Sequence, residues 1–392
     1  MESKLPNSTA GTTKIVPLAF PKGAQKLCAL CQKRAFLQCN GCRVTFYCDD
    51  THQREDWDGI HSRICQSLIT AGSSILNTFQ PTDRNEAQLK KMELIKLCRL
   101  VAQNKMCEGK HQGALPAAQF CLRLSAEIHG PSTVQMVPAY LLLADVNLGN
   151  EDVSYLELMS HSVWLFLDPG VGNLAVVSGL LSQAEWAVLK SPDCGASVRH
   201  QLHRSLGRLH TATGNLDAAL FHFANDIYFA SEELGPDSTA ACSGYFLMAA
   251  VFVRQKKMAV ARSMYAEVAR IWHALLAELV QRFIGKEPEV MSEFDEPQPA
   301  EVDSMLRAIL DFEHADARKD PARVALVNHA LAMLWFLGRD FSKARGFCCA
   351  ALLACESRSN HDLSDAVRHL MELMQTDAGH NSFTSPVSSQ SH

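Results

Sequence analysis

The chain has 392 residues, of which 47% are hydrophobic and 20% are charged, and its formal net charge is -5. These values predict a soluble modular protein of two or three units, because one domain usually holds ~100–200 residues. Lys and Arg number 37 against 42 Asp and Glu, without a long basic run, which argues against nucleic acid as a partner.

Residues 1–22 are predicted to form a flexible N-terminal tail. Their apolar run, Ile15–Phe20, is too short for the hydrophobic region of a signal peptide, and no stretch has the ~18 apolar residues of a membrane span. Six of the 14 cysteines lie between residues 28 and 65 and the other eight are scattered over the rest of the chain, as expected for metal ligation and buried thiols in a reducing compartment. We therefore expect a cytoplasmic protein that binds no membrane.

Residues 23–68 are predicted to form a small zinc-binding domain. Two Cys-x-x-Cys pairs and two pairs at four-residue spacing supply eight ligands, which is enough for two closed tetrahedral sites. A closed site leaves no coordination position for water, so the two Zn²⁺ ions are expected to hold the fold and not to catalyse. The pairs are Cys28 with Cys31, Cys39 with Cys42, Cys48 with His52, and His61 with Cys65.

This pattern, with Trp57 four residues after Gln53, resembles a MYND zinc finger. The resemblance implies that the sites interleave: the first and third pairs share one ion, and the second and fourth share the other. It also implies a protein-interaction module that accepts short proline-containing peptides near Gln53 and Trp57. Packing of Trp57 in the small core is the alternative interpretation of that residue.

His52 departs from the family pattern, which usually has a cysteine at this position. Zinc accepts imidazole as readily as thiolate, so the first site is expected to be a Cys3His site. The alternative is that His52 is a surface histidine and that Asp49 or Asp50 provides the fourth ligand.

Beyond this domain, apolar residues recur at helical spacing, which predicts an all-α body. A linker is expected over residues 69–88 and helical repeats over 89–285. Within them, small residues recur after 42 positions where two helices approach closely, and large residues recur where the gap is filled. The small pairs are Gly207 with Ala249 and Ala219 with Ala261, and the large pairs are Leu206 with Met248 and Phe223 with Tyr265.

This spacing resembles that of tetratricopeptide repeats, which implies a solenoid of about four to five helical hairpins. A Gly-Pro turn at Gly235 should end one hairpin, and Gly130 should end another that has Ala114 in its second helix. An irregular helical bundle is the alternative.

Two parts of the pattern fit the repeat less well. A later match around Ala344 has Gly338 and Phe347 one residue out of register. The interval from Ala144 to Gly207 exceeds one repeat, so we expect an extra helix near Leu180–Leu189.

The remaining segments are predicted from composition. Residues 286–304, acidic and interrupted by prolines, are expected to form a linker before a last helical repeat over 305–375. Residues 376–392 are serine-rich and are expected to be a disordered tail.

Two binding modules without a nucleophile, general base or phosphate-binding loop predict a non-enzymatic adaptor that binds other proteins and no small-molecule substrate. The domain order resembles that of scaffold proteins of cilia and sperm flagella. That resemblance implies a place at the axoneme, with repeat proteins or dynein-linked proteins as partners.

The sequence leaves two alternatives to the ciliary adaptor. One is a nuclear corepressor-type adaptor that binds proline-containing peptides, for which a Lys/Arg-rich targeting run is missing. The other is a SET-domain protein lysine methyltransferase carrying a MYND finger. It is disfavoured because the segment before Cys28 is short and an Asn-His-Ser-Cys motif is absent.

Overall fold

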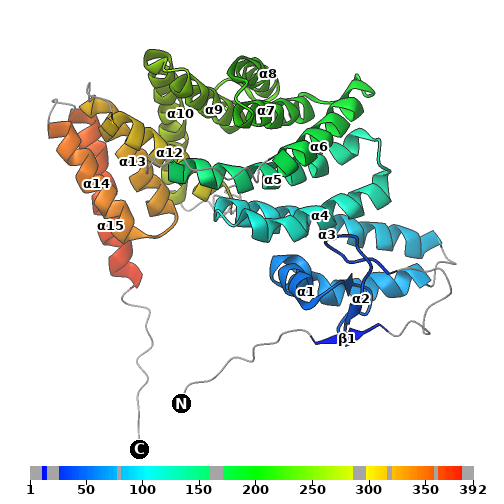
Figure 1. Cartoon of the computed structure of the whole chain (residues 1–392). Helices are drawn as coiled ribbons and strands as arrows, with labels where there is room; N and C mark the ends of the chain where they lie inside the picture. Colours follow the sequence, from blue (N-terminus) through cyan, green and yellow to red (C-terminus); the bar gives the residue numbers. More distant parts are fainter. Residues whose placement is uncertain are drawn as a thin grey trace, which may run out of the picture. The chain divides into compact units, whose positions relative to one another are not determined.

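The computed structural model describes residues 11–15, 26–76, 81–158, 171–285, 297–315, 320–356 and 361–381. Figure 1 shows the helices and strands. The chain divides into two compact units, Met1–Gly214 and Asn215–His392. This boundary falls inside the span 89–285, which the sequence predicted as one run of repeats.

The first unit begins with a three-stranded antiparallel sheet in the order β1-β2-β3. Its strands are β1 (Thr12–Lys14), β2 (Leu37–Cys39) and β3 (Phe46–Tyr47). β1 lies within the segment that was predicted to be a flexible tail. It forms a strand because its backbone pairs with the outer edge of β2 and satisfies the N–H and C=O groups there. Residues 1–10 and 16–22 of that predicted tail lie outside the described residues.

Three consecutive helical elements follow the sheet: α1 (Asp50–Asp56), the π-helical turn η2 (Trp57–His61) and α2 (Ser62–Leu76). Asp49 caps α1, because its Oδ1 accepts the backbone N–H of His52 at 2.8 Å. Together with the sheet, α1, η2 and the first turn of α2 form the finger.

The described residues of the first unit that follow the finger are mainly helical, and helices adjacent in the chain pack against each other. The predicted linker 69–88 is instead mostly helical, because α2 extends to Leu76 and α3 begins at Pro81. The expected extra helix at Leu180–Leu189 is confirmed as the second half of α6. The elements are α3 (Pro81–Cys107), α4 (His111–His129), the 3-10 turn η3 (Val134–Met136), α5 (Val137–Leu158), α6 (Val171–Leu189) and α7 (Ala196–Ala212).

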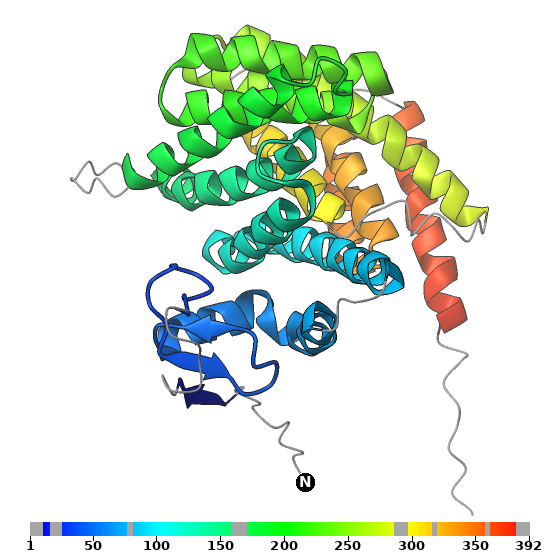
Figure 2. The ribbon, with the colours of Figure 1, turned by 90° about the vertical axis from the view of Figure 1, so that its right-hand side faces the viewer.

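The finger packs directly on α3 and α4 (Figures 1 and 2). Ile60 of η2 and Ile64 of α2 are each 1% exposed, and they share one apolar cluster with Cys98 of α3 and Ala114 of α4. A shared core means that the finger is not a free module on a flexible tether.

The second unit contains a chain of packed helices: α8 on α9, α9 on α10, α10 on α13, α13 on α14 and α14 on α15, with α12 against α13 and α10. Its helices are α8 (Leu216–Leu234), α9 (Thr239–Arg254), α10 (Met258–Ile284), α12 (Pro297–Ala315), α13 (Pro321–Leu337), α14 (Phe341–Glu356) and α15 (His361–Asn381).

The two weakly structured segments predicted in this unit are partly helical. Within the predicted acidic linker 286–304, α12 begins at Pro297 and buries Val302 completely, while 286–296 lie outside the described residues. Within the predicted tail 376–392, α15 continues to Asn381. Residues 382–392 lie outside the described part.

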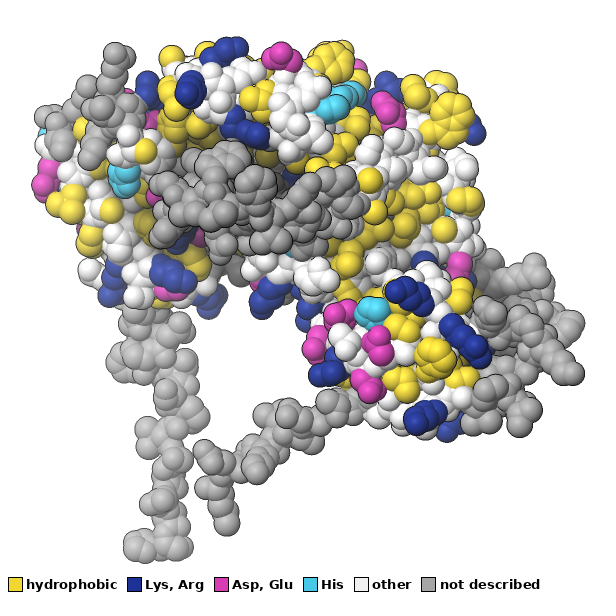
Figure 3. Space-filling view, in the orientation of Figure 1, with side chains coloured by type: hydrophobic (Ala, Val, Ile, Leu, Met, Phe, Trp, Pro, Cys, Tyr) yellow, Lys and Arg dark blue, Asp and Glu magenta, His cyan; other side chains and the backbone are white. Residues whose placement is uncertain are grey.

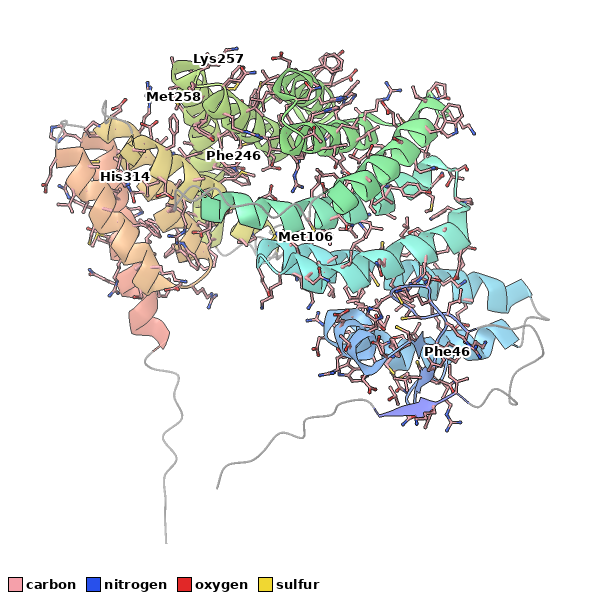
Figure 4. The ribbon with its side chains drawn as sticks, viewed as in Figure 1. Phe46, Met106, Phe246, Lys257, Met258 and His314 are labelled. Carbon is pink, nitrogen blue, oxygen red and sulfur yellow. The ribbon has the colours of Figure 1, made fainter. Side chains whose placement is uncertain are left out.

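Four inter-helix turns share one geometry, each with a single residue at positive φ: Gly109, Gly214, Lys256 and Arg339. The turn between α9 and α10 is marked by Lys257 and Met258 in Figure 4. In each case the fifth residue after the positive-φ position is a fully buried alanine. These alanines are Ala114, Ala219, Ala261 and Ala344.

This geometry corrects the register expected for the α13–α14 hairpin. Arg339, not Gly338, has the left-handed conformation, with φ 59°. The N–H of Asp340 closes the turn on the carbonyl of Trp335 at 3.0 Å, as the N–H of Lys257 does on Phe252 at 2.9 Å. Phe223 and Tyr265 are the buried residues nine positions after Gly214 and Lys256. The residue nine positions after Arg339 is Cys348, not Phe347, and it is fully buried, so this hairpin has the same register as the others.

The two predicted Gly-Pro turns are confirmed as equivalent. Gly130 ends α4 with φ 78°, and Gly235 ends α8 with φ 90°. Both conformations are in the region that only glycine enters without steric cost. No helix in the described part of the chain is long and apolar enough to cross a membrane.

Candidate metal centre

The first group of metal-binding side chains lies where the loop after residue 26 meets β3 and α1. It brings together Cys28, Cys31, Cys48 and His52, whose ligand atoms all lie within 4.8 Å of one another. The Sγ atoms of Cys31 and Cys48 are 3.6 Å apart, and Cys28 Sγ is 3.7 Å from His52 Nδ1. Ligands of a tetrahedral zinc with bonds of ~2.3 Å are separated by about 3.8 Å, so these four residues fit the ion.

The second group joins the β2–β3 turn to the helices. It contains Cys39, Cys42, His61 and Cys65, again within 4.8 Å of one another. Cys39 and Cys65 have Sγ atoms 3.9 Å apart, and Cys42 Sγ is 3.6 Å from His61 Nε2. Cys39, Cys42 and His61 are at most 5% exposed, so this site lies deeper than the first.

The two groups are the only such clusters of three or more ligand-type side chains among the described residues. Each offers four protein ligands, and the pairing follows the interleaved order expected from the sequence. His52 lies in the first cluster, whereas Asp49 caps α1 and neither Asp49 nor Asp50 joins the group. The residues therefore fit two zinc ions, each in a Cys3His environment.

A buried carboxylate supports the second site from outside. Asp56 Oδ2 lies 3.5 Å from His61 Nδ1 and accepts a hydrogen bond from the Tyr47 hydroxyl at 2.7 Å. His61 turns its Nε2 toward the cysteines, so Asp56 is placed to orient the ring, as carboxylates behind zinc-bound histidines do. Burial raises the pKa of Asp56, whereas the Tyr47 hydrogen bond and the charges of His61 and Arg123 lower it.

The π-helical turn explains how Asp56 reaches His61. In η2 the backbone N–H of Ser62 bonds to the carbonyl of Trp57, five residues earlier. One extra residue per turn brings side chains five positions apart onto the same face. Sequence reasoning missed Asp56, and the available signal was only an acidic residue five places before a zinc-ligating histidine.

The two residues predicted for peptide binding differ in accessibility. Gln53 is 7% exposed, so most of its side chain is inside the finger. Trp57 is half-buried, and its ring lies 5.8 Å from the His61 ring, measured between centroids. Trp57 thus packs on a zinc ligand, as the alternative interpretation from the sequence expected, and still has an exposed part.

The family model described as MYND finger matches residues 28–65 of this chain. The match begins and ends at the outermost ligands of the two sites, Cys28 and Cys65. The prediction of a MYND finger with two zinc ions is confirmed. MYND fingers are protein-protein interaction modules, and this chain joins one to a helical body.

Proposed function

We propose that this protein is a non-enzymatic adaptor in which the finger and the helical hairpins bind different proteins. The observation that carries the proposal is the closure of both zinc sites by four protein ligands each. A site of that kind holds a surface in shape and has no position at which a substrate displaces water.

The finger has a surface suited to binding another protein. Leu27, Phe36 and Val44 are 46%, 56% and 45% exposed. Two cations lie over aromatic rings of the finger: Arg34 is 5.8 Å from the Phe36 ring, and Lys26 is 5.0 Å from the ring of Phe46, which is labelled in Figure 4. Figure 3 shows exposed apolar side chains between lysine and arginine side chains on the finger. Exposed apolar residues rimmed by charge are typical of protein interfaces.

The finger's partner is proposed to be a short proline-containing segment. This proposal rests on the resemblance to the MYND family, whose peptide-binding positions correspond to Gln53 and Trp57. The exposed part of Trp57 supports it, because an aromatic ring is a usual surface for packing proline.

The helical body is proposed to be a tetratricopeptide-like scaffold. The repeated turns at Gly109, Gly214, Lys256 and Arg339, each followed by a buried alanine, support this proposal. Repeats of this kind offer extended surfaces to partner proteins.

We further propose that the protein acts at the axoneme of cilia or sperm flagella. The support is the order of a MYND finger followed by helical repeats, which resembles zinc finger MYND domain-containing protein 12. Axonemal repeat proteins or dynein-linked proteins are then the proposed partners.

Co-purification of the full-length chain from ciliated cells tests the adaptor proposal. Phe36→Ser removes an exposed ring without changing a zinc ligand, and Leu89→Ser makes the matched change at a residue of α3 that is 65% exposed. We expect Phe36→Ser to lose a subset of partners and to keep the rest, with Leu89→Ser as wild type. Loss of no partner, or transfer of methyl groups from S-adenosylmethionine to a lysine substrate, would overturn the proposal.

A further inference from the structure

Arg123 of α4 reaches from the helical body into the finger. Its Nη1 donates a hydrogen bond to the carbonyl oxygen of Ala29, which lies between the zinc ligands Cys28 and Cys31. The guanidinium also lies 5.6 Å from the Phe120 ring on the same helix. A residue of the body therefore holds the backbone of the first zinc knuckle.

The charge of Arg123 has counterparts at both zinc sites. Its guanidinium is half-buried, and this burial lowers the pKa of Arg123, whereas the negative charges of Asp56 and Cys28 raise it. Asp56 is the carboxylate behind His61 of the second site, and Cys28 is a ligand of the first. A zinc ion with three thiolates and a neutral imidazole has a net charge of about -1, so zinc loading places two anionic sites near this cation.

The finger and α4 are also in close contact at Gly59. A Cβ placed on Gly59 of η2 would lie 2.6 Å from Cγ of Pro116 on α4, so the Pro116 ring packs against the Gly59 backbone and leaves no room for a side chain there. Ile60 and Ile64 fill the apolar cluster beside them. Because His61 and Cys65 lie on the same turns, the zinc ligands and this apolar contact share one piece of backbone.

We propose that Arg123 is a positioning residue for both zinc sites and that zinc binding thereby stabilises the α3–α4 hairpin. The finger and this hairpin then form one metal-dependent cooperative unit. When zinc leaves, the two lose structure together. This inference is independent of which proteins the adaptor binds.

Hydrogen exchange of the full-length zinc-loaded protein tests the coupling. After zinc is removed by a strong chelator, amides of α3 and α4 should exchange at least about tenfold faster. Amides of α13 and α14 provide the internal reference and should change much less. Unchanged exchange in α3 and α4 after complete removal of zinc would overturn the proposal.

Chelator-driven zinc release tests the role of Arg123 itself. In Arg123→Met, which keeps the side-chain length and removes the charge and the donors, both ions should leave at least about tenfold faster than in wild type. Arg368→Met is the matched control, since Arg368 of α15 is 63% exposed. If Arg123→Met releases zinc at the rate of the Arg368→Met control, Arg123 does not position the zinc ligands.

Three further variants keep the test decisive if Arg123→Met folds poorly. Arg123→Lys retains the charge and should release zinc at an intermediate rate. Asp56→Asn removes the carboxylate behind His61, and its effect should be less than additive with that of Arg123→Gln, which removes the charge, because the charges of the two residues interact. Strict additivity would show that the two zinc sites do not share Arg123.

Discussion

The finger and the α13–α14 hairpin are held together by different interactions. The buried cluster of the finger consists of Tyr47 and three zinc ligands, Cys28, Cys39 and Cys42. The cluster around α13 and α14 consists of aliphatic, aromatic and sulfur-containing side chains from α9, α10 and α12 to α15, and none of them is a zinc ligand. The finger thus depends on metal coordination, whereas the hairpin depends on the volume and shape of packed side chains.

Removal of zinc should give the largest difference in stability between the finger and the α13–α14 hairpin. Each structural zinc contributes on the order of 10 kcal/mol to a small metal-bound fold, so chelation should unfold the β1-β2-β3 sheet. Hydrogen exchange measures this effect, with α14 as the reference element. Elemental analysis of the untreated protein should give two zinc ions per chain. If the sheet amides remain protected from hydrogen exchange without zinc, the finger does not depend on metal coordination.

His52 tests whether the finger needs both ions. His52→Ala should lower the zinc content from two ions toward one, because the first site keeps only three ligands. His52→Cys should retain two, since thiolate is an equally good zinc ligand. Asp49→Asn, which preserves the cap of α1, is the control. Two zinc ions in the His52→Ala protein would show that His52 is dispensable.

Overpacking should affect the hairpins through volume alone. Ala219 of α8 is fully buried beside Met248 and Val251 of α9, so Ala219→Trp should cost ~1–3 kcal/mol or more. Ala224→Trp, on the exposed face of the same helix, should leave the thermal midpoint nearly unchanged. Zinc content should stay at two in both variants. Equal midpoints for the two proteins would place Ala219 outside the core.

The smallest expected effect concerns the shared turn. Gly214 has φ 79° and Lys256 has φ 59°, so both adopt the left-handed conformation that glycine tolerates best. Gly214→Ala should destabilise the protein by about 1 kcal/mol, and Lys256→Gly should stabilise it by about 0.5 kcal/mol. Denaturant unfolding measures both changes. The same sign for the two substitutions would mean that the turns are not equivalent.

Some features could be predicted from the sequence because their signal is local. Zinc ligands are restricted to a few residue types at short fixed spacings, so all eight positions of the two clusters were identifiable. The small residues of the hairpins, such as Ala219 and Ala261, were identifiable because close helix packing excludes larger side chains. The sequence placed the turn of the α13–α14 hairpin at Gly338, one residue too early. The turn position is occupied by Arg339, a residue type that rarely adopts positive φ.

The sequence by itself determined the metal-binding chemistry, the helical class of the body and the spacing of its turns. Only the tertiary structure decided how the finger and the body meet. Arg123 and Ala29 are 94 positions apart, and no local pattern marks a pair that is formed by packing. The same holds for the predicted linker 69–88, which is largely helical. Its first part continues α2, and Ile64 of α2 is buried against α3 and α4 together with Ile60 of the preceding turn η2. Local chemistry can be recognised from residue type and spacing, whereas contacts between distant segments depend on how whole helices pack.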